Sequence, residues 1–454
     1  MSTIAPVVAP PRPAKTRTTL AVLSAAPLLT LLNYTVPVVT VPQTARALGA
    51  GPTGPAWIIN AISLGLAAVL LVAGAVADDH GRRRTLVLGT AVLSAGAIVA
   101  GFAPSTPVFV LARVVQGFAS AAVLAASLGM IGHAFPAGPE RVRATGLYGS
   151  MIGLGIAAGP LISGALATVT SWRAVYWAVA AVAAALAVIS HRSLPESRAD
   201  RPRPVDVPGV VTLSLGLAAL VAGVIEGRLG WNRPLVLWAL GTGVVLLAVF
   251  AVIELRRREP LLDLRLFTRP LFLVANAGAL ITGFALLGLM TFVPALLQLS
   301  HGLTPLGTAA VSTIWSGASF VTALQARRVL PHARARLSAG LALSAVGTLA
   351  LLGFTTEWSW WKLTVGFVVS GIGMGLVNAA LTHLAIESVP SHRAGMGSGA
   401  NNTARYVGAS LGVAVVTSVV GVYGPGDGVN IAIAGSAALA LLAALIVPFV
   451  RGRH

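Results

Sequence analysis

The feature that most constrains this chain is a series of apolar runs, each about twenty residues long, separated by short polar turns. Hydrophobic residues make up 56% of the 454 residues and charged residues only 10%, whereas a soluble domain carries about 25% charged residues. This composition cannot cover a normal water-exposed surface. Runs of this length predict membrane-spanning helices, because barrel strands would alternate over about ten residues. The sequence therefore predicts an all-α polytopic membrane protein.

Fourteen apolar runs are long enough to cross the hydrocarbon core of a bilayer. They fall near residues 19–42, 55–77, 85–103, 107–132, 146–168, 173–190, 208–227, 235–254, 271–298, 305–325, 337–354, 362–386, 396–421 and 429–450. If both termini are cytoplasmic, 24 of the 31 lysines and arginines lie in inner segments, 5 lie in outer segments, and the rest lie inside spans. This bias follows the positive-inside rule and supports the count of fourteen. The net charge of +18 then reflects topology and contact with anionic lipid rather than nucleic-acid binding.

The two longest polar stretches divide the fourteen runs into six, two and six. We therefore predict a cytoplasmic tail at 1–18, a six-helix bundle at 19–190, inner loops with two extra helices at 191–270, a second six-helix bundle at 271–450 and a cytoplasmic tail at 451–454. No stretch is long enough for a soluble catalytic domain, and the chain has no cysteine, which excludes disulfides and thiolate metal sites. We expect neither an enzyme nor a metal site.

A charged turn separates the second and third runs. It resembles the signature loop of the major facilitator superfamily, Gly-x-Leu-Ala-Asp-Arg-x-Gly-Arg-Arg, and the matching residues are Gly74, Ala77, Asp78, Gly81, Arg82 and Arg83. The resemblance implies a major facilitator fold, with two six-helix bundles and a substrate path between them. It also implies a gate in which the Asp78 carboxylate contacts the helix start near Gly395–Ser398. The alternatives are a turn carboxylate without a gating role and arginines that only mark the inner side.

The end of the first run, from Leu32 to Pro42, resembles the first-span motif of the fourteen-span drug:proton antiporter branch of that superfamily. Asn33 occupies the position of the acidic residue of the branch, and asparagine has no proton to exchange. Arg113 and Gln116 resemble the Arg-x-x-Gln-Gly motif of the fourth span, whose arginine is linked to proton coupling in the family. The alternative is that Arg113 binds backbone carbonyls between helices. Either coupling lies elsewhere, or the protein is not a standard proton antiporter.

Gly155, Gly159, Pro160 and Gly164 match the motif Gly-x-x-x-Gly-Pro-x-x-Gly-Gly in the fifth run, with Ser163 in place of one glycine. Small residues let two helices approach closely, and proline kinks a helix. In the superfamily this motif marks exporters, so it indicates the direction of transport.

Polar and aromatic residues inside the spans are candidates for lining a substrate cavity. They are Asn33, Tyr34, Asn60, Arg113, Gln116, Asn276, Gln298, Trp315, Asn378, Asn402 and Arg405. Hydrogen bonding to a neighbouring helix is the alternative for Asn60, and ordinary packing is the alternative for Trp315.

Arg113, Glu226 and His383 are the candidates for proton coupling. Glu226, close to Arg228, can equally be an interfacial carboxylate, and His383 can be a solvated residue at a helix end. No acidic residue lies at mid-membrane depth to neutralise Arg113 or Arg405.

The resemblance covers essentially the whole chain. It implies a secondary active transporter that exports amphipathic small molecules, such as drugs or natural products, by alternating access and with the proton gradient as the energy source. An uncoupled or atypically coupled facilitator, favoured by Asn33, and a non-transporting membrane sensor are the alternatives. We expect a monomer in the plasma membrane that contacts lipid, small-molecule substrates and protons, binds no nucleic acid and uses no cofactor.

Overall fold

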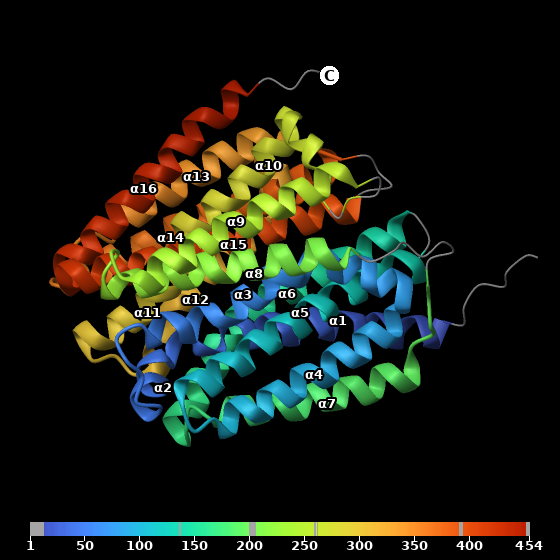
Figure 1. The fold of residues 1–454 in the computed structure, drawn as a ribbon, viewed down its shortest axis with the longest axis horizontal. Coiled ribbons are helices and arrows are strands. Elements are labelled where there is room, and N and C mark those ends of the chain that lie inside the picture. The colour runs from blue at the N-terminus through green and yellow to red at the C-terminus, as the bar shows by residue number, and fades with distance from the viewer. Residues whose placement is uncertain are drawn as a thin grey trace, which may run out of the picture.

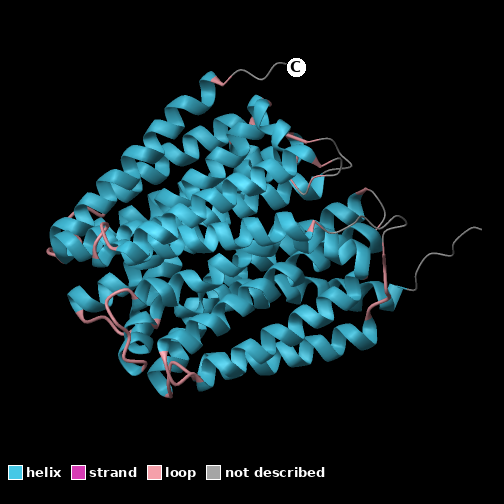
Figure 2. Ribbon diagram, viewed as in Figure 1, coloured by secondary structure: helices cyan, strands magenta, loops and turns pink. Residues whose placement is uncertain are grey.

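The computed structural model describes residues 13–135, 138–198, 206–257, 260, 262–389 and 394–450. Every regular element in these ranges is a helix, as Figure 2 shows. The predicted tail at 451–454 lies outside the described residues, as does most of the tail at 1–18. The first helix nevertheless begins at Pro13, inside that predicted tail. The prediction of an all-α polytopic fold is confirmed.

The first half of the chain folds into long helices joined by short turns. They are α1 (Pro13–Thr35), α2 (Val41–Ala47), α3 (Gly54–His80), α4 (Arg82–Phe102), α5 (Thr106–Ala134), α6 (Pro139–Val169) and α7 (Ala174–Ser193). Proline occupies the first or second position of α3, α5 and α6. A proline is tolerated there because the first N–H groups of a helix have no intrahelical partner.

The predicted first run, 19–42, is not one straight helix. α1 ends at Thr35, a 3-10 turn follows at Val36–Val39, and the short helix α2 begins at Val41. Pro37 and Pro42 lack the N–H group that a continuing α-helix needs, which explains the break. The break turns the chain at the end of the molecule opposite to the Arg82–Arg84 turn.

The second half of the chain begins with a helical pair and continues with a second set of helices. They are α8 (Val207–Glu226), α9 (Pro234–Arg256), α10 (Pro270–Ile281), α11 (Gly288–His301), α12 (Pro305–Val329), α13 (Ala333–Leu349), α14 (Trp360–Glu387), α15 (Ala394–Tyr423) and α16 (Val429–Ile446). π-helical turns at Thr282–Leu287 and Gly424–Gly428 join α10 to α11 and α15 to α16.

The two sets of helices pack against each other along their length. α3 packs on α15 and α6 packs on α12, while α8 packs on α9 and also touches both α3 and α15. In Figure 1 the blue and teal helices of the first half lie below the orange and red helices of the second half, and α8 runs along the boundary. The division into two six-helix bundles remains a prediction.

Eleven helical segments of the described residues are long and apolar enough to cross a membrane, and the last of them, Met396–Phe449, contains both α15 and α16. α12 and α13 are helical but do not meet that criterion. Each of the fourteen predicted runs therefore overlaps at least one helix, and the number of crossings remains a prediction.

Candidate functional site

Arg113 in α5 is fully buried, with 0% of its surface exposed. Its Nη1 donates to Oδ1 of Asn33 at 2.9 Å and to Oε1 of Gln116 at 2.8 Å. Its Nη2 donates to the backbone oxygens of Asn33 at 2.9 Å and Tyr34 at 3.5 Å. The guanidinium carbon also lies 5.6 Å from the centre of the Tyr176 ring. We call Arg113, Asn33 and Gln116 the Arg113 group; four of the five guanidinium N–H groups have an acceptor.

Neutral groups alone accept hydrogen bonds from Arg113. Among the described side chains, no aspartate or glutamate forms an ion pair with Arg113 or with Arg405. An isolated buried guanidinium is expensive in an apolar interior, so the amide and carbonyl dipoles stabilise its charge. Asn33 thus contacts Arg113. The acidic residue that the antiporter branch has at this position would neutralise the charge of that arginine. The structure brings Asn33, Arg113 and Gln116 together, and their role in lining a substrate cavity remains a prediction.

Arg405 in α15 has a different environment. Its Nη2 donates to Oδ1 of Asn402 at 2.9 Å and its Nη1 to Oδ1 of Asn378, on α14, at 3.3 Å. The guanidinium carbon lies 5.5 Å from the centre of the Tyr406 ring. The residue is partly exposed, and its Nε has no hydrogen-bond partner among the described residues. We call Arg405, Asn378 and Asn402 the Arg405 group; two of its five guanidinium N–H groups are engaged.

Two tyrosines connect the Arg113 group to the Arg405 group. The rings of Tyr34 and Tyr406 meet edge to face, with centroids 5.5 Å apart. Tyr34 contacts Arg113 through its backbone oxygen, and Ser63 donates to its hydroxyl at 3.1 Å. The first and second halves of the chain therefore meet at an aromatic contact between the buried Arg113 and the partly exposed Arg405.

Three other cavity candidates lie outside the Arg113 and Arg405 groups and differ in their surroundings. Asn60 is 1% exposed, and neither atom of its side-chain amide has a partner among the described residues. Asn276 donates to the Phe272 oxygen in its own helix at 2.9 Å. Trp315 packs against the apolar cores of both halves. Their role in a cavity remains a prediction, and the same holds for the other candidates.

Gln298 joins the two halves at the end of the molecule opposite to the Arg82–Arg84 turn. Its Oε1 accepts from Nε2 of Gln43, on α2, at 3.0 Å, and its own Nε2 donates to the Val39 oxygen at 2.6 Å and to Thr308 Oγ1 at 3.2 Å. Gln43 was not among the candidates, because nothing in its sequence surroundings distinguishes it from an ordinary polar residue at a helix end.

The glycines of the α6 motif lie at helix contacts. A Cβ atom on Gly155 would lie 2.5 Å from the Leu28 oxygen of α1, and one on Gly159 would lie 2.7 Å from the Leu32 oxygen. A Cβ atom on Gly164 would lie 2.8 Å from the Pro305 oxygen of α12. The motif thus lets α6 approach α1 and α12 closely, as its small residues predicted, with Pro160 buried inside the helix.

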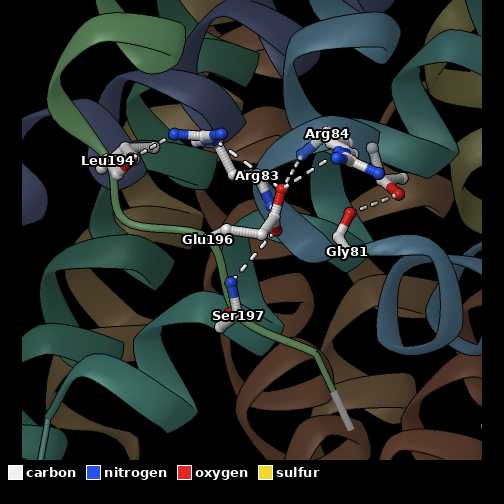
Figure 3. A network of polar contacts seen from close by, with 7 residues as sticks. Gly81, Arg83, Arg84, Leu194, Glu196 and Ser197 are labelled. Carbon is white, nitrogen blue, oxygen red and sulfur yellow. Dashed lines mark hydrogen bonds and ion pairs between the residues drawn. The ribbon is translucent and has the colours of Figure 1, made fainter.

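The charged turn is held by a carboxylate that the sequence did not single out. The backbone N–H groups of Arg83 and Arg84 donate to Glu196 at 3.0 and 3.3 Å, and their side chains lie 3.7 and 3.8 Å from it (Figure 3). The Arg82 N–H donates to the Ser197 oxygen at 2.9 Å. Glu196 therefore caps the first turn of α4, where a negative charge is favourable. An acidic residue in the loop after α7 was the available signal, since that loop was predicted on the same side as the turn.

Gly81 is required by the geometry of this turn. Its φ of 103° is one that other residues rarely adopt, and a Cβ atom would lie 2.8 Å from a Glu196 oxygen. Gly74 lies in α3, before the turn. The side chain of Asp78 and residues 390–393 lie outside what is described, so the predicted contact between Asp78 and the start of α15 stays a prediction.

The remaining coupling candidates lie near the ends of helices. The Trp57 indole donates to the Glu226 carboxylate at 2.9 Å, so Glu226 connects α8 to α3. His383 Nδ1 lies 3.8 Å from Glu387 and 3.4 Å from Nη2 of Arg336. Within the described residues, no group of three or more His, Asp or Glu side chains is arranged to hold a metal ion.

The sequence also matches a known protein family. Residues 23–413 match the Major Facilitator Superfamily. The chain is 34% identical over 410 residues to the puromycin resistance protein pur8 of Streptomyces alboniger, a match that covers 88% of this chain and 81% of the relative.

Two mycobacterial proteins are also similar. The multidrug resistance protein Stp of Mycobacterium tuberculosis is 32% identical over 384 residues, covering 84% of this chain and 71% of the relative. The multidrug efflux pump LfrA of Mycolicibacterium smegmatis is 29% identical over 411 residues, covering 90% and 81%.

Proposed function

The chain belongs to the Major Facilitator Superfamily, and we propose that it is a secondary transporter that exports amphipathic small molecules by alternating access. As a member of this family it is a multi-pass membrane transporter and not an enzyme. The observation that carries the proposal is the similarity, over most of both chains, to relatives named for drug resistance and drug efflux. The exporter motif in α6 and the two arginines inside apolar helices, Arg113 and Arg405, agree with it.

Alternating access requires contacts between the halves that break and re-form. The Gln43–Gln298 hydrogen bond is suited to this, because it joins α2 to α11 through neutral groups at one end of the molecule. The Glu196-capped turn lies at the other end, inside the first half. We assign the turn to the cytoplasm, together with both termini and the arginine-rich loops, and the Gln43 end to the outside. The protein then works as a monomer in the plasma membrane, in contact with anionic lipid.

The proton gradient is the proposed energy source, and the Arg113 group is the first place to look for coupling. Asn33 cannot release a proton, so coupling must use another titratable group, such as Glu226 or His383, or must be absent. The facilitator alternative therefore depends on Asn33 alone. The sensor alternative gains no support from the similarity to efflux proteins.

Transport in proteoliposomes tests the proposal. Purified protein is reconstituted, and movement of the neutral amphiphile 1-naphthaleneacetamide and of puromycin is measured with and without an imposed pH gradient; protein-free vesicles serve as the control. We expect an outward-directed flux that a pH gradient accelerates several-fold. Flux that ignores the gradient would favour the facilitator, and failure to move either compound would count against export.

Cross-linking tests alternating access directly. Because the chain has no cysteine, the double variant Gln43→Cys, Gln298→Cys can be linked specifically with a short bifunctional thiol reagent. Linking α2 to α11 should abolish flux, and a reductant that cleaves the linker should restore it. Each single variant treated in the same way is the control. Unaltered flux in the linked protein would show that this end need not open.

A further inference from the structure

The Arg405 group has unused capacity to bind an anion. An arginine is always protonated and offers five N–H donors in a rigid fork, and in Arg405 the hydrogen bonds to Asn378 and Asn402 engage two of them. The Nε atom is shielded from solvent and has no partner among the described residues. The residue as a whole is partly exposed, so a ligand can reach it. A buried or half-buried donor without an acceptor lowers stability until something accepts its hydrogen bond.

The charge of Arg405 is also uncompensated. No described aspartate or glutamate pairs with it, and its two acceptors are neutral amide oxygens. The second cation, Arg113, is connected to it through the Tyr34–Tyr406 contact. Two positive charges without an acid repel cationic solutes and attract anionic ones, and they do so more strongly where water is scarce.

The neighbours of Arg405 define the rest of the ligand. Asn378 of α14 and Asn402 of α15 hold the guanidinium from two helices, which fixes the direction of the fork. The Tyr406 ring lies under the guanidinium and contacts the Tyr34 ring. The Tyr406 ring is itself buried and Tyr34 is partly exposed, so the aromatic surface open to a ligand near the guanidinium is that of Tyr34, which suits a molecule with an acid at one end and an apolar body.

Arg113 does not offer the same site. It is 0% exposed, and four of its donors already have acceptors. A carboxylate would have to displace Asn33 or Gln116 in order to reach the guanidinium, whereas at Arg405 three donors are unused.

We propose that the Arg405 group binds the acidic group of an anionic amphiphile, so that the substrates of this protein include aromatic or aliphatic carboxylates. The proposal rests on the export function proposed above and names the class of substrate. A carboxylate accepts two parallel hydrogen bonds from the guanidinium fork, which a neutral isostere cannot match.

Binding of a matched pair of ligands tests the proposal. 1-Naphthaleneacetic acid is ionised at pH 7, and 1-naphthaleneacetamide has the same ring and nearly the same shape without the charge. Calorimetric titration of the full chain in zwitterionic lipid nanodiscs should give an affinity about tenfold higher for the acid, the scale of a hydrogen bond to a charged group. Equal affinities in the unmodified protein would overturn the proposal without any variant.

Variants then assign the preference to one residue. Arg405→Gln should abolish the preference, and Arg405→Lys should retain part of it, because lysine keeps the charge but not the fork. Arg233→Gln removes an exposed arginine in the turn before α9 and should retain the full preference. A preference that survives in Arg405→Gln would place the acid elsewhere and contradict the proposal.

Two further arms separate the outcomes. The tenfold preference should be the same in chloride and fluoride buffers of equal ionic strength; a preference that changes with chloride would show that a free inorganic anion occupies the site, against the proposal. Export of the acid and the amide from proteoliposomes tests the proposed binding site separately from the proposed export function. Export without acid preference contradicts the site alone, whereas acid-selective binding without any export supports the site and counts against the export function.

Discussion

Arg113 and Arg405 have the same kind of partner but differ in how completely their N–H groups are satisfied. The Arg113 group closes around its guanidinium from α1 and α5 and leaves only Nε unpaired. The Arg405 group holds its guanidinium at two points and leaves three donors unused. The first arrangement is that of a structural contact between helices, and the second is that of a binding site. The difference shows that amide and carbonyl partners alone do not indicate whether an arginine is a structural contact or a binding site; the number of its N–H groups that have acceptors does.

Two further arginines, Arg83 and Arg84, show why the buried arginine is held by neutral amides and not by carboxylates. Arg83 and Arg84 meet the carboxylate of Glu196 at the end of the bundle, where the glutamate side chain is 22% exposed. Water there solvates whatever charge the pair leaves uncompensated. Deep in the protein, removing two opposite charges from water costs several kcal/mol per ion, which their attraction recovers only with good geometry. A neutral amide partner avoids the cost of removing a second ion from water.

The largest effect is expected from removing an acceptor of each arginine in turn. Asn33→Leu keeps the side-chain size but leaves one Nη1 hydrogen of Arg113 without an acceptor in a fully buried site, because Gln116 accepts only the other one. We expect the free energy of unfolding to fall by about 1–3 kcal/mol, the usual cost of an unsatisfied buried polar group. Asn378→Leu removes a longer bond, 3.3 Å, from a partly exposed guanidinium and should cost less than about 1 kcal/mol.

Both variants are measured by detergent-titrated unfolding of the purified protein, followed by tryptophan fluorescence. The unmodified protein and Asn378→Leu are the controls for Asn33→Leu. Equal losses in the two variants, or a larger loss in Asn378→Leu, would remove the distinction between a structural and a binding arginine.

The helices were predictable because few backbone conformations satisfy all N–H and C=O groups inside a bilayer. Apolar runs such as 55–77 and 107–132 must satisfy their backbone groups internally, so they form α3 and α5 nearly as expected. The predicted run at 19–42 failed in its last third, although Pro37 and Pro42 were visible. Hydrophobicity indicates that a segment is buried in lipid or protein, and it does not register a missing N–H group.

The contacts of the site were less predictable than its members. Asn33, Arg113, Asn402 and Arg405 were all identifiable as polar residues inside apolar runs, since such residues are rarely placed there without a function. Their partners depend on how helices pack. The residues of the Gln43–Gln298 bond are 255 positions apart, and no local pattern encodes a contact at that separation.

Restoring the acidic residue of the antiporter branch at position 33 should change proton coupling. We expect this effect to be smaller than the effect of Asn33→Leu on stability. Asn33→Asp places a carboxylate where Oδ1 now lies 2.9 Å from Arg113, and so adds a group that can exchange a proton. We expect the ratio of flux with a pH gradient to flux without one to rise about threefold, well within the range of typical coupling free energies. The equivalent change in the Arg405 group, Asn378→Asp, is the control and should instead weaken binding of naphthaleneacetic acid. An unaltered flux ratio in Asn33→Asp would exclude this position from coupling.

The smallest effect is expected at the capped turn, where an arginine pair does have an acid. Glu196→Gln retains an oxygen that can accept from the N–H groups of Arg83 and Arg84 but removes the negative charge at the start of α4. Because this site is partly exposed, the loss in unfolding free energy should be below about 1 kcal/mol and should shrink further at high salt. Glu357→Gln removes a more exposed ion pair with Lys362, in which the glutamate side chain is 72% exposed, and should change the stability even less. A loss in Glu196→Gln as large as that in Asn33→Leu would mean that the charged turn, and not the amide-bound interior, is where an arginine contributes most to this fold.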